Sequence, residues 1–319
     1  MMSMQVATPQ IKKQLPLAKK LNRGRHKPYL FILPWVLGFV FFTLGPMFFS
    51  LIISLFDYPI VGERTFIGLD NYINMFTDDP LFWKSLWVTV KFAIYFVPLN
   101  LMISLLLAVL LNLKVRGSGI FRTIFYLPSV ISGVALAMIW AWVYSGDFGI
   151  LNYVLSFFGI VGPDWLREPG WSMVAMIGAS LWGQGSMMLI FLAGLKAIPK
   201  DLYESSSLDG ASKARQFFSI TLPMLSPTIL FNVITSIISA FQQLTLALTL
   251  TGGGPMNETH FYAMYVYENA FKYFHLGYSA ANAWFMFLII LVLTLAVFKS
   301  TSMWVYYEGE VKKNKSAKG

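Results

Sequence analysis

Long apolar runs separated by short polar segments dominate this sequence. The first run, Tyr29–Leu55, contains no charged residue, and as an α-helix rising about 1.5 Å per residue it exceeds the roughly 30 Å hydrocarbon core of a bilayer. Hydrophobic residues make up 56% of the chain and charged residues only 12%. A soluble domain carries about a quarter charged residues. The sequence therefore predicts an all-α membrane protein.

Similar runs predict six transmembrane helices within a membrane domain at residues 29–300, between a basic tail (1–28) and a C-terminal tail (301–319). A further apolar patch at 150–160 is too short to span. The expected spans are Tyr29–Leu55, Leu86–Leu113, Thr123–Tyr144, Trp171–Leu195, Met224–Leu250 and Tyr278–Phe298.

Lysine and arginine alternate in density along the segments between these spans. Seven lie in the first 28 residues, three in 114–122, four in 196–223 and five in 299–319, against four in the intervening segments. Positively charged segments stay in the cytoplasm, so both termini and the 196–223 segment are expected there. Topology and anionic lipid headgroups then explain the net charge of +9, and no nucleic-acid-binding module is visible.

The chain carries no recognisable catalytic or metal-binding pattern. It has no cysteine, its three histidines lie outside the apolar runs, and it lacks a Walker lysine loop and a His-Glu-x-x-His helix. We therefore expect no enzyme activity, metal or cofactor in this chain. The inner parts of the spans also lack ionisable residues, which argues against a proton-coupled carrier; sodium coupling through hydroxyls and carbonyls stays open.

The polar segment between the fourth and fifth spans carries helix signals. Pro199 suits a first helical turn, Gly210 a C-terminal stop, and Ser212 the N-cap of a second helix. These residues predict a helix at Pro199–Asp209, a glycine bend and another helix. A continuous bent helix is the alternative, because a glycine inside a helix costs only about 1 kcal/mol relative to alanine.

This segment resembles the cytoplasmic signature loop of bacterial ABC-importer permeases, whose pattern is Glu-Ala-Ala, then Gly, then Ile-x-Leu-Pro. Ser205 and Ser206 replace the two alanines, which keeps the small size but adds hydroxyls. An ordinary solvated loop with a capping glycine is the alternative. The matching residues are Glu204, Asp209, Gly210, Ala211, Ile220, Leu222 and Pro223.

The resemblance implies a type I ABC-importer permease fold in a bacterial cytoplasmic membrane. It also implies four kinds of partner: a second permease, two ATPase subunits that hold ATP and Mg²⁺, an extracytoplasmic solute-binding protein, and lipid. An ion-coupled secondary transporter is the alternative. The residues expected to meet the ATPase are Leu202, Glu204, Ser205, Ser206, Leu208, Asp209, Gly210 and Ala211.

The fifth predicted span is rich in uncharged hydrogen-bonding side chains, and five of them (232, 235, 236, 239 and 243) fall at helical spacing on one face. Such groups are costly against lipid, so this face is expected to meet protein or water. They suit sugars, and equally they could join helices. The candidate substrate-path residues are Asn232, Ser236, Ser239, Gln242 and Gln243, with Trp182, Gln184 and Ser186 in the fourth span.

Two stretches near the C-terminus extend the resemblance to carbohydrate importers. The turn Gly252, Gly253, Gly254 and Pro255 is similar to a loop that faces the binding protein in sugar-type permeases, although a flexible turn is the simpler explanation. The stretch Trp304–Glu310 resembles the first permease of the pair. The resemblance thus implies half of a translocation path for a sugar, with an oligosaccharide expected before a monosaccharide.

Overall fold

The computed structural model describes residues 27–113 and 117–306. The predicted basic tail lies outside this part except for its last two residues, which begin a helix. The C-terminal tail is described only as far as Tyr306, and the final helix continues through Trp304. The stretch Trp304–Glu310 is therefore only partly covered, and the predicted domain boundaries at 28 and 300 stay predictions.

The chain divides into two compact units, the first of which ends at Ile52. It contains α2 (Lys27–Phe39), a π-helical turn η1 (Val40–Leu44) and α3 (Gly45–Ile53). Residues Phe31–Ile53 are apolar and long enough to cross a bilayer. None of the side chains described in η1 or α3 is buried, which suits a helix that meets lipid.

The second unit is organised around α5 (Pro80–Asn112), the longest helix of the described chain. Asp79 caps it, because one carboxylate oxygen accepts hydrogen bonds from the backbone N–H groups of Leu81 (2.9 Å) and Phe82 (3.1 Å). Before α5 come the paired strands β1 (Phe56–Asp57) and β2 (Thr65–Phe66) and helix α4 (Asp70–Thr77). Buried side chains run along the whole length of α5.

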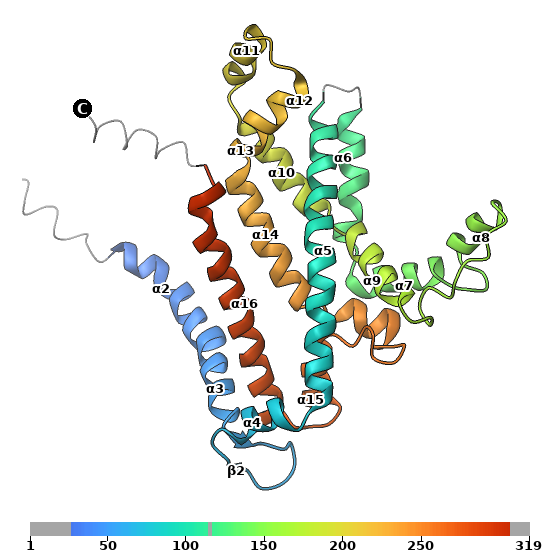
Figure 1. Cartoon of the computed structure of the whole chain (residues 1–319). Coiled ribbons are helices and arrows are strands. Elements are labelled where there is room, and N and C mark those ends of the chain that lie inside the picture. The colour runs from blue at the N-terminus through green and yellow to red at the C-terminus, as the bar shows by residue number, and fades with distance from the viewer. Residues whose placement is uncertain (1–26, 114–116, 307–319) are drawn as a thin grey trace, which may run out of the picture. The chain divides into compact units, whose positions relative to one another are not determined.

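Three predicted spans are bent or broken rather than straight (Figure 1). The third bends by 102°, the fourth by 50° and the fifth by 66° near its start. Each bent pair still covers the stretch over which a span was predicted. Their parts are α6 (Ser118–Tyr126), η2 (Leu127–Val130), α7 (Gly133–Val143), α9 (Trp171–Trp182), α10 (Gly185–Ala197), α12 (Lys213–Gln216), η3 (Phe217–Thr221), α13 (Leu222–Met224), α14 (Ser226–Phe241) and η4 (Ala247–Thr251).

The described residues hold three helices long and apolar enough to span a membrane, or up to six if each bent pair is one span. The third long helix is α16 (Leu276–Trp304). This agrees with the six predicted spans. The connecting segments contain α8 (Ile150–Ser156), α11 (Lys200–Leu208) and α15 (Tyr262–Phe271).

Candidate functional site

The interruptions of the third, fourth and fifth spans have local causes. In the third span, Pro128 lies in η2 and lacks a backbone N–H. In the fourth span, Gly183 follows the last residue of α9. In the fifth span, the helix α14 ends at Phe241. Inside a membrane, backbone groups released by such breaks need partners from protein or water. Discontinuous spans therefore mark places where a helix borders a polar site.

These interruptions lie against one another. A Cβ atom on Gly185 would sit 2.5 Å from the carbonyl oxygen of Phe125, so α10 starts directly beside the end of α6. A Cβ atom on Gly133, at the start of α7, would lie 3.2 Å from Cγ2 of Thr245. We call three stretches the break region: residues 127–132 and 183–184, which interrupt the third and fourth spans, and residues 242–245, which follow the end of α14 and are separate from the bend near the start of the fifth span.

Exposed polar and amphipathic side chains border the break region. Trp182 is 41% exposed, and an indole offers both a flat face and an N–H donor. Exposed hydroxyls and amides within a span are costly against lipid, so these side chains are expected to meet protein or water. The exposed predicted path residues are Trp182, Ser186, Ser239 and Gln242.

The other predicted path residues point into the bundle. Ser236 is 1% exposed and accepts a hydrogen bond from Asn100 of α5 at 3.1 Å, and the same amide lies 3.4 Å from Oε1 of Gln184. Asn232 is fully buried. These contacts join α5, α10 and α14, which is the helix-packing role that such residues often have in membranes.

The predicted polar face of the fifth span assumed a helix as far as Leu250, and this was wrong beyond Phe241. Gln243, the last residue of that predicted face, therefore no longer follows the helical spacing of Asn232 and Ser236. The side chain of Gln243 turns toward the fourth span and donates to Oγ of Ser180 at 3.0 Å. The direction of the Gln243 side chain could not be predicted from helical spacing, because that spacing holds only while the helix is unbroken.

Three further buried polar residues of the spans were not predicted from the sequence: Asn100, Ser104 and Ser180. Asn100 and Ser104 lie four residues apart within an apolar run, and the hydroxyl of Ser104 lies 3.4 Å from Oδ1 of Asn100. Polar pairs at this spacing inside a span signal an inward-facing stripe. The same signal was available in the sequence of the second span.

The segment between the fourth and fifth spans forms helix, glycine bend and helix, as predicted. Its first helix is α11, Gly210 has a φ of +77°, and the hydroxyl of Ser212 accepts from the N–H of Arg215 at 3.3 Å. The left-handed backbone at position 210 favours glycine. The alternative of one continuous bent helix is thereby excluded.

Gln216 ties the two helices of this segment together. Its side-chain amide, on a residue that is 3% exposed, donates to the carbonyl of Tyr203 (3.2 Å) and to the hydroxyls of Ser206 (3.0 Å) and Ser207 (2.8 Å). Tyr203 also bonds Thr221 through its hydroxyl at 2.8 Å. Ser206, one of the two hydroxyl substitutions in the signature, thus has a structural use.

The outer surface of this segment presents unpartnered apolar side chains. Leu208 is 90% exposed and Leu202 39% exposed. In Figure 1, α11 lies at one end of the second unit, away from α4 and α15 at the other end. Of the remaining predicted contact residues, Ser206 and Ala211 are half-buried, and Glu204, Ser205, Asp209 and Gly210 are exposed.

The glycine-rich turn after the fifth span is folded against the bundle. Gly252 (φ +58°) and Gly253 (φ +85°) are left-handed, and a Cβ atom on Gly253 would lie 2.9 Å from Cδ2 of His260. Thr259 donates to the carbonyl of Gly254 at 2.6 Å. Gly252 is exposed, Gly253 is buried, and Gly254 and Pro255 are half-buried. The prediction of a contact with a binding protein is untested by these positions.

Residues 251–277 connect the fifth and sixth spans and contain α15, which is largely buried. His260 bridges two elements, with Nδ1 2.8 Å from Oγ of Ser85 and Nε2 2.9 Å from Oε2 of Glu268. Lys272 contacts the other oxygen of Glu268 at 3.0 Å. Burial alone would raise the pKa of Glu268, but the hydrogen bonds from His260 and Lys272 outweigh it and lower that pKa.

A second polar cluster joins α15 to α5 and α16. Asp79, which caps α5 with one oxygen, accepts with its other oxygen from the hydroxyls of Tyr265 and Tyr278. Tyr262 is fully buried and donates to Oδ1 of Asn282 at 2.8 Å. An aspartate directly before a proline and the aromatic spacing of α15 were the available signals, but they look like ordinary loop residues in a single sequence.

Together, the candidate spans, the broken middle of three of them and the projecting helical segment define a multi-pass membrane transport subunit. The sequence model of one family, described as binding-protein-dependent transport system inner membrane component, matches residues 100–305. The chain belongs to this family, and it is a permease of the ABC-transporter class.

The chain is similar along nearly its whole length to named permeases. It is 44% identical to the probable ABC transporter permease protein YesP of Bacillus subtilis, over 92% of this chain and 96% of that protein. It is 35% identical to the trehalose/maltose transport system permease protein MalF of Thermococcus litoralis, over 84% of this chain and 90% of that protein.

The fold also matches a solved structure, that of a bacterial alginate ABC transporter in complex with an alginate pentasaccharide-bound periplasmic protein. The TM-score is 0.77 at 23% identity, and the match covers 89% of this chain and 96% of that one. The predicted type I importer permease fold is thereby confirmed.

Proposed function

We propose that this chain forms half of the translocation path of an ATP-driven importer whose cargo is a sugar, an oligosaccharide before a monosaccharide. The observation that carries this proposal is the exposed, uncharged polar surface at the break region. Gln242 and Ser239 can donate and accept hydrogen bonds, and Trp182 offers a flat face. Hydroxyl-rich, uncharged ligands need this combination. The name of the trehalose/maltose protein supports a sugar of this kind, and the alginate pentasaccharide in the solved structure supports an oligosaccharide, although alginate itself is acidic.

A second permease is needed to complete the path. Exposed polar side chains border the break region, and lipid is an unfavourable neighbour for them. A related subunit covering these side chains would enclose a polar passage between the two. The chain itself carries no enzyme activity in this proposal and binds no cofactor.

The exposed α11 segment is the proposed contact for the ATPase. Two ATPase subunits would hold ATP and Mg²⁺, and each would receive one such segment. Leu202 and Leu208 would provide apolar contact area, with Glu204 and Asp209 as charged neighbours. An extracytoplasmic binding protein would deliver the sugar at the opposite end, near Gly252–Pro255.

The proposed orientation places both termini and α11 in the cytoplasm of a bacterial cell. Four basic residues lie at 196–215 around α11, whereas the end near α4 carries aspartates at 57, 70, 78 and 79. The basic residues support a cytoplasmic α11, because segments rich in Lys and Arg stay in the cytoplasm, whereas acidic residues contribute little to orientation. An ion-coupled secondary transporter finds no support in the comparisons, since the matched family is that of binding-protein-dependent permeases.

The test is sugar-stimulated ATP hydrolysis in liposomes that hold this chain, its paired permease, the ATPase and the binding protein. Monosaccharides, oligosaccharides, polyol phosphates and peptides are compared as cargo. We expect stimulation by an oligosaccharide that Gly210→Val abolishes, because a β-branched residue at a φ of +77° forces the bend to rearrange.

Gly68→Val is the matched control. Gly68 also has a positive φ (+60°) and open space around it, but it lies near β2 at the other end of the unit. The control variant should keep its stimulation. Uptake that persists without the ATPase, or stimulation only by a non-sugar, would refute the proposed energy source or the proposed cargo respectively.

A further inference from the structure

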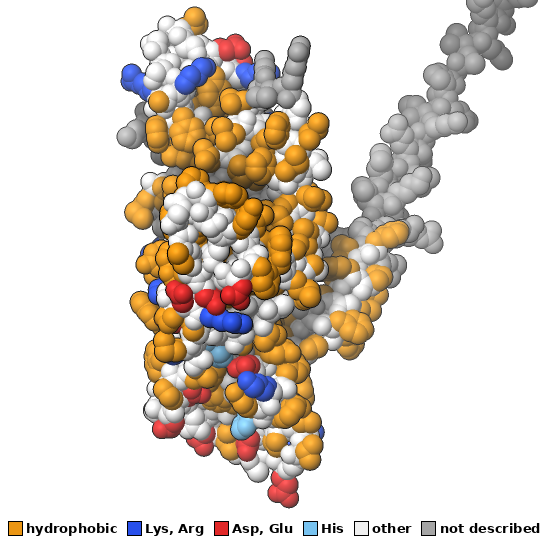
Figure 2. All heavy atoms as spheres, turned by 90° about the vertical axis from the view of Figure 1, so that its right-hand side faces the viewer, with side chains coloured by type: hydrophobic (Ala, Val, Ile, Leu, Met, Phe, Trp, Pro, Cys, Tyr) orange, Lys and Arg blue, Asp and Glu red, His pale blue; other side chains and the backbone are white. Residues whose placement is uncertain are grey.

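The connection between α7 and α9 carries an uncharged apolar segment on its surface. We call residues 148–162 the α8 segment; they include no charged residue, and α8 lies within them. Phe157 is 71% exposed and Val161 97% exposed. Figure 2 shows hydrophobic side chains over much of the face from which α8 projects in Figure 1. The other exposed apolar residues are Phe148, Ile150, Tyr153, Val154, Phe158 and Ile160.

The α8 segment is held in shape by polar contacts on its inner side. The amide of Asn152 donates to the carbonyls of Gly146 (3.0 Å) and Pro163 (3.1 Å), and its oxygen accepts from Nε1 of Trp165 at 2.7 Å. A Cβ atom on Gly162 would lie 2.1 Å from Oδ1 of Asn152, so only glycine permits this closure. The apolar side chains are thus presented outward by a fixed scaffold.

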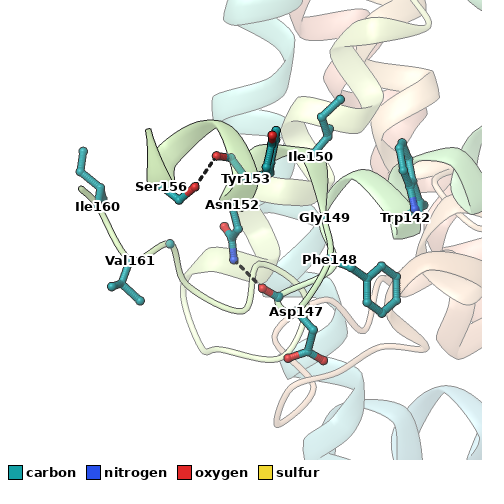
Figure 3. A pocket seen from close by; sticks show the side chains of 12 residues that line it. Trp142, Asp147, Phe148, Gly149, Ile150, Asn152, Tyr153, Ser156, Ile160 and Val161 are labelled. Carbon is teal, nitrogen blue, oxygen red and sulfur yellow. Dashed lines mark hydrogen bonds between the residues drawn. The ribbon is translucent and has the colours of Figure 1, made fainter. Parts of the chain in front are cut away.

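A hollow of about 710 Å³ lies within this segment and is lined by residues such as Trp142, Asp147 and Tyr153 (Figure 3). Its mixture of aromatic and polar residues superficially suits a sugar. However, the Asn152 amide is already used, and the hydroxyl of Ser156 donates to the carbonyl of Tyr153 at 2.6 Å. The hollow is otherwise lined mainly by apolar residues and glycines, and Asp147 contributes its one carboxylate, so the lining as a whole is a poor match for a sugar.

The exposed apolar surface continues from α8 onto α7, which belongs to a candidate span. Val134 (50% exposed), Met138 (66%) and Trp142 (55%) follow one another at four-residue spacing on one side of α7. Acidic residues flank the α8 segment at Asp147 and Asp164. These carboxylates favour water, so the uncharged stretch between them is the part that can enter the membrane surface.

We propose that the α8 segment lies in the boundary between lipid headgroups and acyl chains and anchors this part of the chain to the bilayer surface. A lipid surface is favoured over a docking protein because the segment offers almost no free hydrogen-bonding groups. Reversible protein interfaces are about as polar as the rest of a protein surface. Its length of seven helical residues suits lying on the membrane and excludes spanning it.

The test uses the absence of cysteine from the chain, which permits single-site spin labelling. Phe157→Cys is labelled with a nitroxide in the full-length chain within its assembled transporter, in nanodiscs of phosphatidylethanolamine with a minority of phosphatidylglycerol. Val161→Cys, where the native side chain makes almost no packing contact, is the second site. Glu63→Cys, in the exposed turn between β1 and β2, is the control.

We expect labels at 157 and 161 to collide several-fold more often with oxygen, which concentrates in lipid, than with a water-soluble nickel chelate. The label at 63 should show the reverse preference. Preferential collision with the nickel chelate at 157 and 161 would overturn the proposal. Protection of these two labels from both oxygen and the nickel chelate would also overturn the proposal, because the segment would then be covered by protein. This holds whether the protection is present from the start or arises only after the binding protein is added.

Discussion

Two segments that connect spans differ in how they are fastened to the bundle. The α11 segment after the fourth span presents its apolar residues outward, with Leu208 90% exposed, and Gln216 and Tyr203 hold its two helices together. The segment after the fifth span buries its aromatic residues, with Tyr262 and Phe261 fully buried. In the sequence, both segments lie between apolar runs that are long enough to span a membrane.

The segment that contains α11 therefore offers a surface for a partner, whereas the segment that contains α15 is part of the folded core. The α11 segment is internally rigid but leaves its outer face free, so it can transmit a displacement as a unit. The α15 segment contacts α5 through Ser85 and Asp79, and α16 through Tyr278. Changes in α15 should therefore lower stability, whereas changes in α11 should impair coupling.

The largest expected effect is that of Tyr262→Ala. Removing a fully buried ring and its hydrogen bond to Asn282 should reduce the free energy of unfolding by about 3–5 kcal/mol. Tyr267→Ala on the same helix, where the side chain is 36% exposed, is the matched control. Thermal unfolding of both variants in detergent measures the difference; equal losses would show that α15 is not a core element.

Gln216→Ala tests the segment of α11 and α12, at the other end of the second unit from α15. Loss of its three hydrogen bonds should loosen α11 from α12 and reduce sugar-stimulated ATP hydrolysis several-fold, with a smaller loss of thermal stability than in Tyr262→Ala. Arg215→Ala, an adjacent exposed side chain, should retain stimulation. If hydrolysis is unchanged in Gln216→Ala, rigidity within this segment is not required for coupling.

The pH dependence of stability should arise partly from Glu268. Its pKa is lower in the folded protein than the ordinary value of 4.5, so the unfolded state takes up protons first as pH falls. The stabilisation is therefore complete above about pH 4.5 and is lost as pH drops through the folded-state pKa. Glu268→Gln should remove this part of the dependence, and Glu204→Gln on α11 should leave it in place. An unaltered pH profile in Glu268→Gln would contradict this assignment.

Lys272→Ala should have the smallest effect of the series. Its side chain is 59% exposed, and surface ion pairs contribute little because water and salt screen them. The expected change is a slight fall in the midpoint of thermal unfolding that disappears at high salt. A fall as large as that of Tyr262→Ala would mean that Glu268 depends on this lysine for more than a surface contact.

Sequence reasoning succeeded where structure is decided locally. The helix expected at Pro199–Asp209 is observed as Lys200–Leu208, and the stop at Gly210 and the cap at Ser212 follow from backbone and side-chain preferences of single residues. Apolar runs likewise showed the number of spans, because burial in a bilayer depends on length and composition.

Prediction from the sequence failed where the structure depends on contacts between residues far apart in the chain. The end of α14 at Phe241 and the closeness of Gly185 to Phe125 depend on how three spans meet, which no periodicity within one span reveals. For the same reason the sequence could not separate buried Asn232 and Ser236 from exposed Ser239 and Gln242. The burial of α15 could not be predicted either, because it depends on contacts with α5 and α16.

The most direct test of this account is the accessibility of Leu208, since an exposed apolar side chain on α11 is the feature that needs a partner. A cysteine introduced by Leu208→Cys is allowed to react with a maleimide in detergent, with and without the ATPase subunits, and Glu63→Cys serves as the control. The account predicts that the ATPase slows labelling at position 208 several-fold and leaves position 63 unaffected. Equal labelling rates at position 208 in both conditions would contradict the assignment of α11 as the surface that meets the ATPase.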